Sequence, residues 1–468
     1  MNPIARRTFL KKSSSAGLTS MIGACLFPDY LFGRTGNEDQ LPYKAICSVK
    51  REIYVALTEP RKAPMATMSY VGQGLRREEL RSFMQSNDWN ESLNKRTSDD
   101  NGHSWSDWVT EPKQAETKGQ FTLSGGAFQY GSVPFDPISG FLIKPVFQRI
   151  FQGVPQIALK EIWKGNRLFW DHGFYQLSGD DGKTWGESHQ LKYEEGPDFD
   201  PSEWGRQEYL RKNEMYIGSS IVLKNGTVLI CATVPVLYRD EADEKNPSIF
   251  PNNYREGCVA GAICFIGKWN KTKRDYDWKK SNTIFLPRRV STRGLSELDV
   301  SELANGNLLM IMRGSNAGLD ISKSPGRRWF SVSKDKGHTW EEVKDMRYDT
   351  GEQFFSSATI SKTIRSSKTG KLYWVGNITK VPPKGNLPRY PLQIVEIDEQ
   401  GPSFRKNTVT VIDDRDPVHD SEFLQLSNFS LLEDRETKNM EIYLTRIGET
   451  GGGADNWTAN AYKYTLIF

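Results

Sequence analysis

Three copies of one eight-residue pattern constrain the fold of this 468-residue chain more than any other feature. The pattern S-x-D-x-G-x-[ST]-W occurs at residues 98–105, 178–185 and 333–340, and we call these segments the octads. In such a segment the Asp carboxylate accepts hydrogen bonds from turn N–H groups, the Gly takes a positive φ, and the Trp anchors the hairpin. Five fixed positions that occur three times indicate one repeated hairpin, and therefore a repetitive β architecture.

Further pairs of apolar runs around turn residues extend this series. Predicted hairpins flank Asn225-Gly226, Asn305-Gly306, the turn at 368–370 and the charged turn before Glu441. An Asn-Gly pair predicts a two-residue turn in which both residues have positive φ. The units recur at roughly 60 to 80 residues, which leaves room for four strands in each.

Both ends of the folded region also carry structural expectations. The last run, Ala461 to Phe468, is expected to pair with N-terminal chain and close a ring of sheets, which removes exposed edges. Near the N-terminus we expect a short hairpin between residues 45–49 and 53–57. The segment RREELRSFMQ, residues 76–85, is the best candidate for a helix.

The octads resemble the Asp boxes, or BNR repeats, of the sialidase superfamily. That resemblance implies an all-β, six-bladed β-propeller over residues 41–468. It also implies that the octads are structural and lie away from the catalytic face, so they indicate a fold and not a chemistry.

The resemblance extends to candidate site residues before the third octad. Members of the superfamily carry a Glu that assists the nucleophile, followed by the second arginine of a triad that binds the substrate carboxylate. Glu297 and Arg313 match that pair, and Arg327 or Arg328 matches the third arginine. A guanidinium fork suits a planar carboxylate or a sulfate. In the alternative interpretation these arginines form ion pairs on a solvated rim, with Asp299, Asp320 and Asp335.

The sequence departs from the superfamily at three positions. Residues 41–57 contain no Arg-Ile-Pro run for the first arginine of the triad. The loop before the first octad offers only Asp88 as the general acid. Where the nucleophilic Tyr is expected the chain has Phe354 and Phe355, with Tyr348 and Tyr373 on either side at other spacings.

Two further segments carry candidate site residues. Asp171 and His172 stand together before the second octad, as an acid–base element near neutral pH or as a structural pair at a strand end. Arg389 and Tyr390 lie between two prolines, in a stiff turn that presents them to a pocket or simply connects two strands.

The N-terminus predicts export from a bacterial cell. Residues 1–24 combine Arg6-Arg7 with an apolar run, which is typical of a twin-arginine signal, and residues 25–40 form a linker. Cys25 ends a lipoprotein-like box, so a lipid on Cys25 and simple cleavage both remain open; the mature protein would be periplasmic or at the cell surface. Loss of residues 1–24 removes four basic and no acidic side chains, and the net charge falls from +4 to zero. A neutral protein has no net attraction to nucleic acid, and we expect a monomer.

The remaining cysteines, Cys47, Cys231, Cys258 and Cys264, do not have metal-ligand spacing. We therefore expect no zinc site, and no motif predicts a cofactor. Cys231 and Cys264 lie in apolar runs and are expected to pack in a core, while Cys258 and Cys264 are candidates for a disulfide in an oxidising compartment.

These observations predict an exported exo-glycoside hydrolase acting on an acidic glycan, such as one ending in sialic acid, uronic acid or a sulfated sugar. The arginines would bind the anionic group, Glu297 would assist a nucleophile or act as a base, and Asp88 or Asp171 would protonate the leaving oxygen. Two alternatives stay open: a polysaccharide lyase acting on a uronate, and a propeller that binds carbohydrate without catalysis.

Overall fold

A computed structural model describes residues 45–84, 92–112, 115–127, 133–162, 166–238, 258–450 and 457–468. The chain divides into two compact units, Met1–Leu41 and Pro42–Phe468. The first unit lies outside the described residues, so everything below concerns the second. No helix among the described residues is long and apolar enough to cross a membrane.

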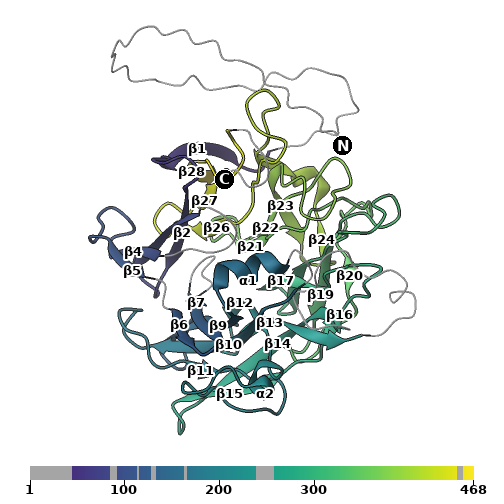
Figure 1. The fold of residues 1–468 in the computed structure, drawn as a ribbon. Helices are drawn as coiled ribbons and strands as arrows, with labels where there is room; N and C mark the ends of the chain where they lie inside the picture. Colours follow the sequence, from purple (N-terminus) through teal and green to yellow (C-terminus); the bar gives the residue numbers. More distant parts are fainter. Residues whose placement is uncertain are drawn as a thin grey trace, which may run out of the picture. The chain divides into compact units, whose positions relative to one another are not determined.

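The second unit is a β-propeller of six antiparallel sheets, which we number as blades 1 to 6 (Figure 1). Blades 1 and 2 contain β2 (Ala63–Tyr70), β3 (Arg77–Met84), β4 (Ser92–Ser98) and β5 (Val109–Pro112), then β6 (Ala115–Lys118), β7 (Phe121–Ala127), β8 (Phe135–Asp136), β9 (Phe141–Gln152), β10 (Phe169–Ser178) and β11 (His189–Gln190). Two short helices, α1 (Pro155–Glu161) and α2 (Gln207–Leu210), lie in connections.

The remaining blades follow in chain order. Blades 3 and 4 contain β12 (Tyr216–Val222), β13 (Val228–Leu237), β14 (Cys258–Asn270), β15 (Asp275–Lys280) and β16 (Ile284–Phe285), then β17 (Ser296–Glu302), β18 (Leu308–Arg313), β19 (Arg328–Ser333) and β20 (Lys344–Asp345). Blades 5 and 6 contain β21 (Lys362–Arg365), β22 (Leu372–Gly376), β23 (Leu392–Asp398), β24 (Ser403–Phe404), the 3-10 turn Lys406–Thr408 and β25 (Thr410–Asp413), then β26 (Ser430–Glu433), β27 (Met440–Thr445), β28 (Ala461–Ile467) and β1 (Ser48–Val55).

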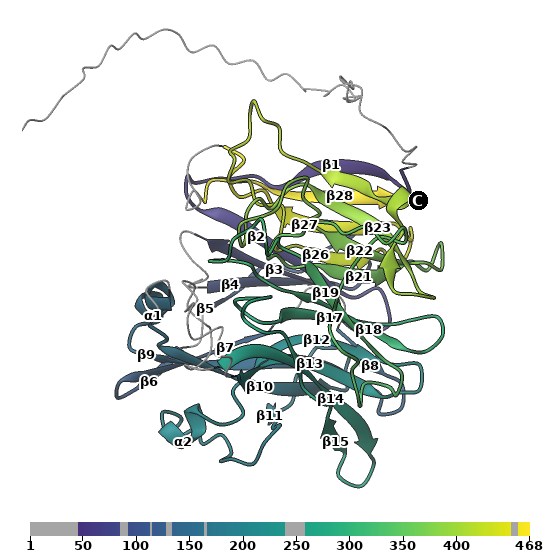
Figure 2. The ribbon, with the colours of Figure 1, turned by 90° about the vertical axis from the view of Figure 1, so that its right-hand side faces the viewer.

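The ring closes in blade 6, where the N-terminal strand β1 pairs with the C-terminal strand β28 from Ser48↔Ile467 to Val55↔Ala461 (Figure 2). This confirms the expected closure. The expected hairpin within residues 45–57 is wrong, because β1 is one continuous strand whose partner comes from the other end of the chain. Local alternation predicted strand structure but not the strand partner.

The innermost strands of neighbouring blades lie side by side: β12 beside β17, β17 beside β21, β21 beside β26 and β26 beside β2. Apolar clusters fill the space between blades; one of them joins Leu298 and Met310 of blade 4 to Cys231 and Cys264 of blade 3. The propeller has two faces. We call the one that carries the octad turns the octad face, and the other, where the first strand of each blade begins, the start face.

The three octads form the same turn. In each, the first Ser donates to the Asp carboxylate at 2.7–2.9 Å and accepts the Gly N–H at 2.8–2.9 Å. The Ser or Thr at the seventh position donates its N–H to the same carboxylate at 2.8–2.9 Å. Hydrogen bonds from Thr184 and Ser178 hold the pKa of Asp180 down at about 2. Of the three tryptophans only Trp340 is buried; Trp105 and Trp185 are half-buried beneath Arg96 and Lys144.

Two local predictions are corrected. The Asn225-Gly226 and Asn305-Gly306 hairpins exist, but only the Gly of each pair has a positive φ, 76° and 80°. In both, the Gly N–H donates to a Leu carbonyl three residues earlier, and the Asn side chain accepts the N–H of the residue after the Gly. These loops are therefore not the two-residue turns that were expected.

The expected helix at residues 76–85 is also wrong, because residues 77–84 form strand β3 between β2 and β4. Its charged side chains are buried in ion pairs: Arg77 bonds Asp434 and Glu441, and Glu79 accepts from Arg81 and Arg96. Tertiary pairing thus overrides the helix preference of Arg, Glu and Leu.

Candidate functional site

Glu297 and Arg313 form a direct ion pair on the start face of blade 4. Arg313 is the last residue of β18 and pairs with Ser296 at the start of β17, so a hairpin closed at the octad face brings the two side chains together at its open end. Their side chains are 20% and 12% exposed, so solvent reaches both only in part. The spacing of sixteen residues that suggested this pair is the length of that hairpin.

Glu297 has a backbone conformation that few side chains adopt. Its φ is 49°, in the left-handed region, and the β17–β18 register shifts between Ser296 and Asp299. A bulge of this kind re-aims a side chain, and strained backbone of this kind clusters at functional sites. One carboxylate oxygen, Oε2, is buried and has no hydrogen-bond partner among the described residues. An acceptor left in this state is a place where a ligand or water donor fits.

Arg328 lies directly beside this pair but is fully buried. It faces Arg313 across the β18–β19 register and is 1% exposed. Its hydrogen bonds go to neutral groups: the Thr359 carbonyl at 2.9 Å, the Ser356 hydroxyl at 3.0 Å and the Ser357 carbonyl at 3.2 Å. Burial lowers the pKa of Arg328 to about 10, Glu297 opposes that shift and Arg313 adds to it. Two guanidinium groups and one carboxylate leave the cluster with one excess positive charge.

The Arg327 side chain bonds a different set of groups from the side chain of Arg328. It donates to the Phe354 carbonyl at 2.7 Å and to the Gln353 side chain at 2.9 Å, and it lies over the Phe355 ring. Of the two arginines proposed for the third position, only Arg328 therefore adjoins Arg313, and it supports the cluster from within the fold.

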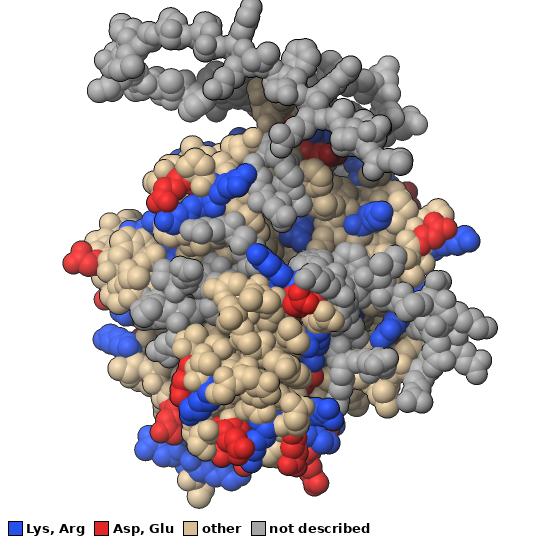
Figure 3. All heavy atoms as spheres, in the orientation of Figure 1, with Lys and Arg blue, Asp and Glu red and all other residues tan. Residues whose placement is uncertain are grey.

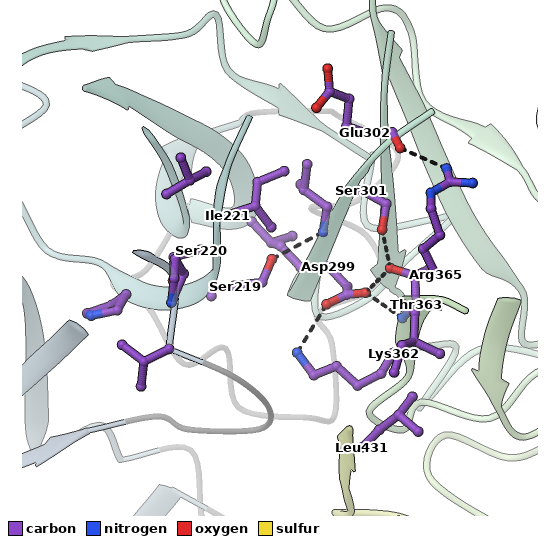
Figure 4. Close-up of a pocket in the computed structure, with 18 of the residues that line it drawn as sticks. Ser219, Ser220, Ile221, Asp299, Ser301, Glu302, Lys362, Thr363, Arg365 and Leu431 are labelled. Carbon is purple, nitrogen blue, oxygen red and sulfur yellow. Dashed lines mark hydrogen bonds and ion pairs between the residues drawn. The ribbon is translucent and has the colours of Figure 1, made fainter. Parts of the chain in front are cut away.

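A central pocket of about 600 Å³ runs between the inner strands of the blades (Figure 4). Glu297 lines it, together with Tyr216 and Ser219 of β12 and Asp299 of β17. The Asp299 carboxylate accepts from Lys362 at 3.1 Å and from the Thr363 N–H at 2.7 Å, and it bonds blade 4 to blade 5. The alternative in which the site arginines pair with aspartates is wrong: Asp299 binds Lys362, Asp320 binds Ser322, and Asp335 binds Ser333 and Thr339.

Asp171 and His172 lie on the start face of blade 2, near the beginning of β10, and the contacts of both side chains are structural. Asp171 accepts two hydrogen bonds from Arg149, at 2.6 and 2.7 Å. His172 is completely buried, stacks on Tyr209 with 4.2 Å between ring centroids, and burial lowers its pKa to about 4. A base that is neutral at pH 7 and shielded from solvent cannot donate a proton there. This placement favours the structural interpretation of the pair.

Two other candidates lie in the connection between β22 and β23. Arg389 donates to Gln425 and Ser427, and Tyr390 packs on the blade 5–6 core. Asp88 lies outside the described residues.

Sequence reasoning missed the groups that surround Arg328. Ser356 and Thr359 accept its hydrogen bonds, and the Trp374 ring lies 5.6 Å from its guanidinium. The only signal was their position, because Ser356 follows the two phenylalanines where a Tyr was sought. Among the described residues, no group of three or more His, Cys, Asp or Glu side chains could hold a metal ion.

Neither sign of charge dominates the face shown in Figure 3, where basic and acidic side chains are interspersed.

Comparison with known proteins supports the fold. No family model matches the sequence, and no curated protein does. Solved structures that match include a protein of unknown function from Dyadobacter fermentans DSM 18053, at 14% identity over 90% of this chain and 99% of that chain, with a TM-score of 0.53. The NanB sialidase from Streptococcus pneumoniae matches at 14% identity over 91% of this chain and 70% of that chain, with a TM-score of 0.50, and a NanB structure with Optactamide at 12% identity over 89% and 70%, with a TM-score of 0.54.

Proposed function

Because this chain has the six-bladed propeller fold of the sialidase-like superfamily, we propose that it is a glycoside hydrolase acting on the acidic end of a glycan. The observation that carries the proposal is the cluster of Glu297, Arg313 and Arg328. It combines an excess positive charge, a carboxylate with an unused buried oxygen, and a strained backbone at the open end of a hairpin.

Arg313 is the residue proposed to bind the substrate's anionic group. An arginine carries five N–H donors, and among the described residues Glu297 is the one side chain that accepts a hydrogen bond from Arg313. Arg328 cannot reach a ligand from its buried position, but its charge acts through a low-dielectric region and strengthens anion binding at Arg313. A carboxylate or sulfate fits this arrangement.

Glu297 is proposed to act on the reacting sugar, as a base or as the partner of a nucleophile. An incoming anion would compete with Glu297 for Arg313 and weaken the ion pair between the two side chains. Glycoside cleavage also needs a proton for the leaving oxygen. Asp171 is held by Arg149, so Asp88 is the acid that we propose, and it awaits a direct test.

One observation favours a second candidate function, which is carbohydrate binding without catalysis. Phe354 and Phe355 stand where the nucleophilic Tyr is expected, and a phenylalanine has no hydroxyl. Phe354 is buried in the blade 4–5 core, and Phe355 lies against Arg327. Tyr348 packs on Phe354 and Tyr373 is 2% exposed, so neither replaces the missing nucleophile. A lyase acting on a uronate is the third possibility, since it needs no nucleophile.

Incubation with a panel of acidic glycans, followed by mass spectrometry, separates the three functions. Hydrolysis adds water to the products, elimination leaves an unsaturated uronate, and binding leaves every mass unchanged. Arg313→Ala and Glu297→Gln should remove turnover, whereas Arg347→Ala, an exposed arginine of the same blade paired with Asp345, should not. Equal turnover by all three variants and the parent would exclude the cluster as the site.

We also propose that the protein is exported through the twin-arginine pathway. Arg6-Arg7 and the apolar run that follows support this. Arg6→Lys with Arg7→Lys should trap the precursor in the cytoplasm, and a Cys25→Ser variant should lose membrane attachment if a lipid is added there. Normal export of the double lysine variant would argue against the pathway.

A further inference from the structure

Two buried cysteines face each other across the middle of blade 3. Cys231 of β13 and Cys264 of β14 are directly opposite in the antiparallel register, and both are 0% exposed. Their sulfur atoms are 2.9 Å apart. That is closer than the roughly 3.5–4.0 Å at which even non-bonded carbon atoms rest, although sulfur is larger than carbon.

The backbone geometry at this position suits a covalent link. Residues directly opposite in an antiparallel pair have Cα atoms about 4.5–5.5 Å apart, and a disulfide needs about 4.4–6.8 Å. A link therefore needs only a small rotation of two side chains. The pair considered from the sequence, Cys258 with Cys264, is excluded: both lie on β14, and six residues of strand separate them by roughly 20 Å.

We propose that Cys231 and Cys264 form a disulfide that links the two central strands of blade 3. A thiolate of the pair attacks a disulfide oxidant, such as glutathione disulfide or a protein disulfide, and displaces one thiol from it. The second cysteine, as its thiolate, then attacks the mixed disulfide and displaces the other thiol. Two protein S–H bonds are lost, one S–S bond forms, and the oxidant is reduced to two thiols that carry the two protons.

The surroundings of the pair determine when it can react. Burial raises the pKa of the Cys264 thiol, and the thiolate is the reactive form. Both sulfur atoms lie in the apolar cluster between blades 3 and 4, with Leu298 of β17 and the octad Trp340. The folded protein therefore shields the thiols, and oxidation requires a state of the chain in which β17 does not cover the pair.

The consequence of the link is local to the two strands and to the chain between them. It joins residues that are 33 positions apart in the chain and lie opposite each other on two neighbouring strands. It also fixes the sheet against which β17 packs, immediately after Glu297. A disulfide that closes a loop of this size stabilises chiefly by restricting the unfolded chain.

The test determines which cysteines of the full chain carry a free thiol after refolding, and no reductant is present when the thiols are alkylated. The reduced, unfolded protein is refolded with a mixture of reduced and oxidised glutathione, unfolded again in denaturant, treated with iodoacetamide and digested. We expect Cys47 and Cys258 to be alkylated, because Cys258 lies opposite Leu237 in the β13–β14 register and Cys47 packs in the core cluster with Tyr373 and Leu424. Cys231 and Cys264 should instead appear as one linked pair of peptides that separates only after reduction. Alkylation of both Cys231 and Cys264 in refolded protein, or a link from either of them to another cysteine, would overturn the proposal.

Variants provide a second, independent measurement. Reductant should lower the Tm of the parent protein by a few degrees, and it should do the same to the Cys47→Ser, Cys258→Ser control. The Cys231→Ala, Cys264→Ala variant should start at the lower Tm and show no response to reductant. A parent protein whose Tm does not respond to reductant contradicts the disulfide. Already folded, reduced protein should react with glutathione disulfide far more slowly than unfolded protein, and equal rates would contradict the shielding of the thiols by β17.

Discussion

Two buried arginines, Arg77 between blades 1 and 6 and Arg328 in blade 4, show opposite ways to hold a charge inside this propeller. Arg77 donates to Asp434 at 2.6 Å and to Glu441 at 2.9 Å, and also to Tyr70 and Asn101. Burial works against its charge, but Glu441 and the other partners more than offset that effect and raise its pKa. Arg328 bonds only neutral groups, and burial lowers its pKa to about 10.

The difference indicates which cluster is structural and which has room for a ligand. Two carboxylates surround Arg77: Glu441 lies on β27 and Asp434 directly follows β26, both in the blade that closes the ring. Around Arg328 the single carboxylate, Glu297, is shared with Arg313, so one positive charge is left over. A buried charge without a carboxylate is costly, and such groups are kept mainly where a function uses them.

The largest expected effect is on stability, at Arg77. Arg77→Met leaves Asp434 and Glu441 without their shared cation in a buried site, and we expect the free energy of unfolding to fall by about 3–5 kcal/mol. Urea denaturation measures this. The neighbouring Arg76 pairs with the exposed Asp99, so Arg76→Met is the matched control and should lose less than about 1 kcal/mol. Equal losses in the two variants would show that buried Arg77 contributes no more to stability than Arg76 does.

The next effect is on binding, at Arg313. Arg313→Ala should weaken binding of an acidic glycan by about 3 kcal/mol, or roughly a hundredfold, because a partly desolvated anion loses its partner. The Tm should stay close to that of the parent protein. Calorimetric titration and a thermal melt check the two halves of this prediction. A large loss of Tm with unchanged affinity would place Arg313 with the structural arginines.

A third effect concerns pH, at His172 of blade 2. Its folded pKa of about 4 lies below its usual value of about 6.5, so the unfolded chain binds a proton more readily between those values. The neutral ring therefore contributes stability that is fully present above pH 6.5 and is lost as the pH falls through 4. The charges nearest to it are Asp171, held by Arg149, and Arg167, paired with Glu214.

Replacement of His172 measures how much this one ring contributes to the loss of stability at low pH. Between pH 7.5 and pH 4.5 the parent protein should lose about 2 kcal/mol more of its free energy of unfolding than His172→Phe, which keeps the stacking on Tyr209. Urea denaturation at several pH values measures both proteins. Parallel pH profiles would show that His172 is not a titrating group of the fold.

The smallest effect is on anion affinity, at Glu297. Glu297→Gln removes the internal partner of Arg313 without changing side-chain length, so a sulfate ion should bind more tightly by about 1 kcal/mol, or roughly fivefold. Catalytic turnover should disappear in the same variant. The rise of Tm with sulfate concentration measures the affinity, and Glu302→Gln, at the octad end of the same strand, is the control. An identical sulfate response in all three proteins would contradict the excess charge.

The fold could be predicted from the sequence to a large extent, because its signals are local. The octads, the Asn-Gly hairpins and the final strand report turn chemistry and alternation within a few residues. They were enough for a repetitive all-β architecture closed by its two ends, and the resemblance of the octads to Asp boxes implied the propeller. The Glu297–Arg313 pair was also predictable, since one hairpin sets the distance between them.

What the tertiary structure decided is which polar side chains meet and how much water reaches them. The composition of residues 76–85 favours a helix. Arg77 nevertheless forms an ion pair with Glu441, which is 364 residues away in the sequence, and residues 77–84 form strand β3. Nothing in the order Arg327-Arg328 says which one is buried beside Arg313, and nothing in Asp171-His172 says that the ring is sealed beneath Tyr209. Ion pairing and desolvation depend on residues brought together from distant parts of the chain. Local patterns therefore indicated the β architecture, whereas long-range packing determined which charged groups meet and which are buried.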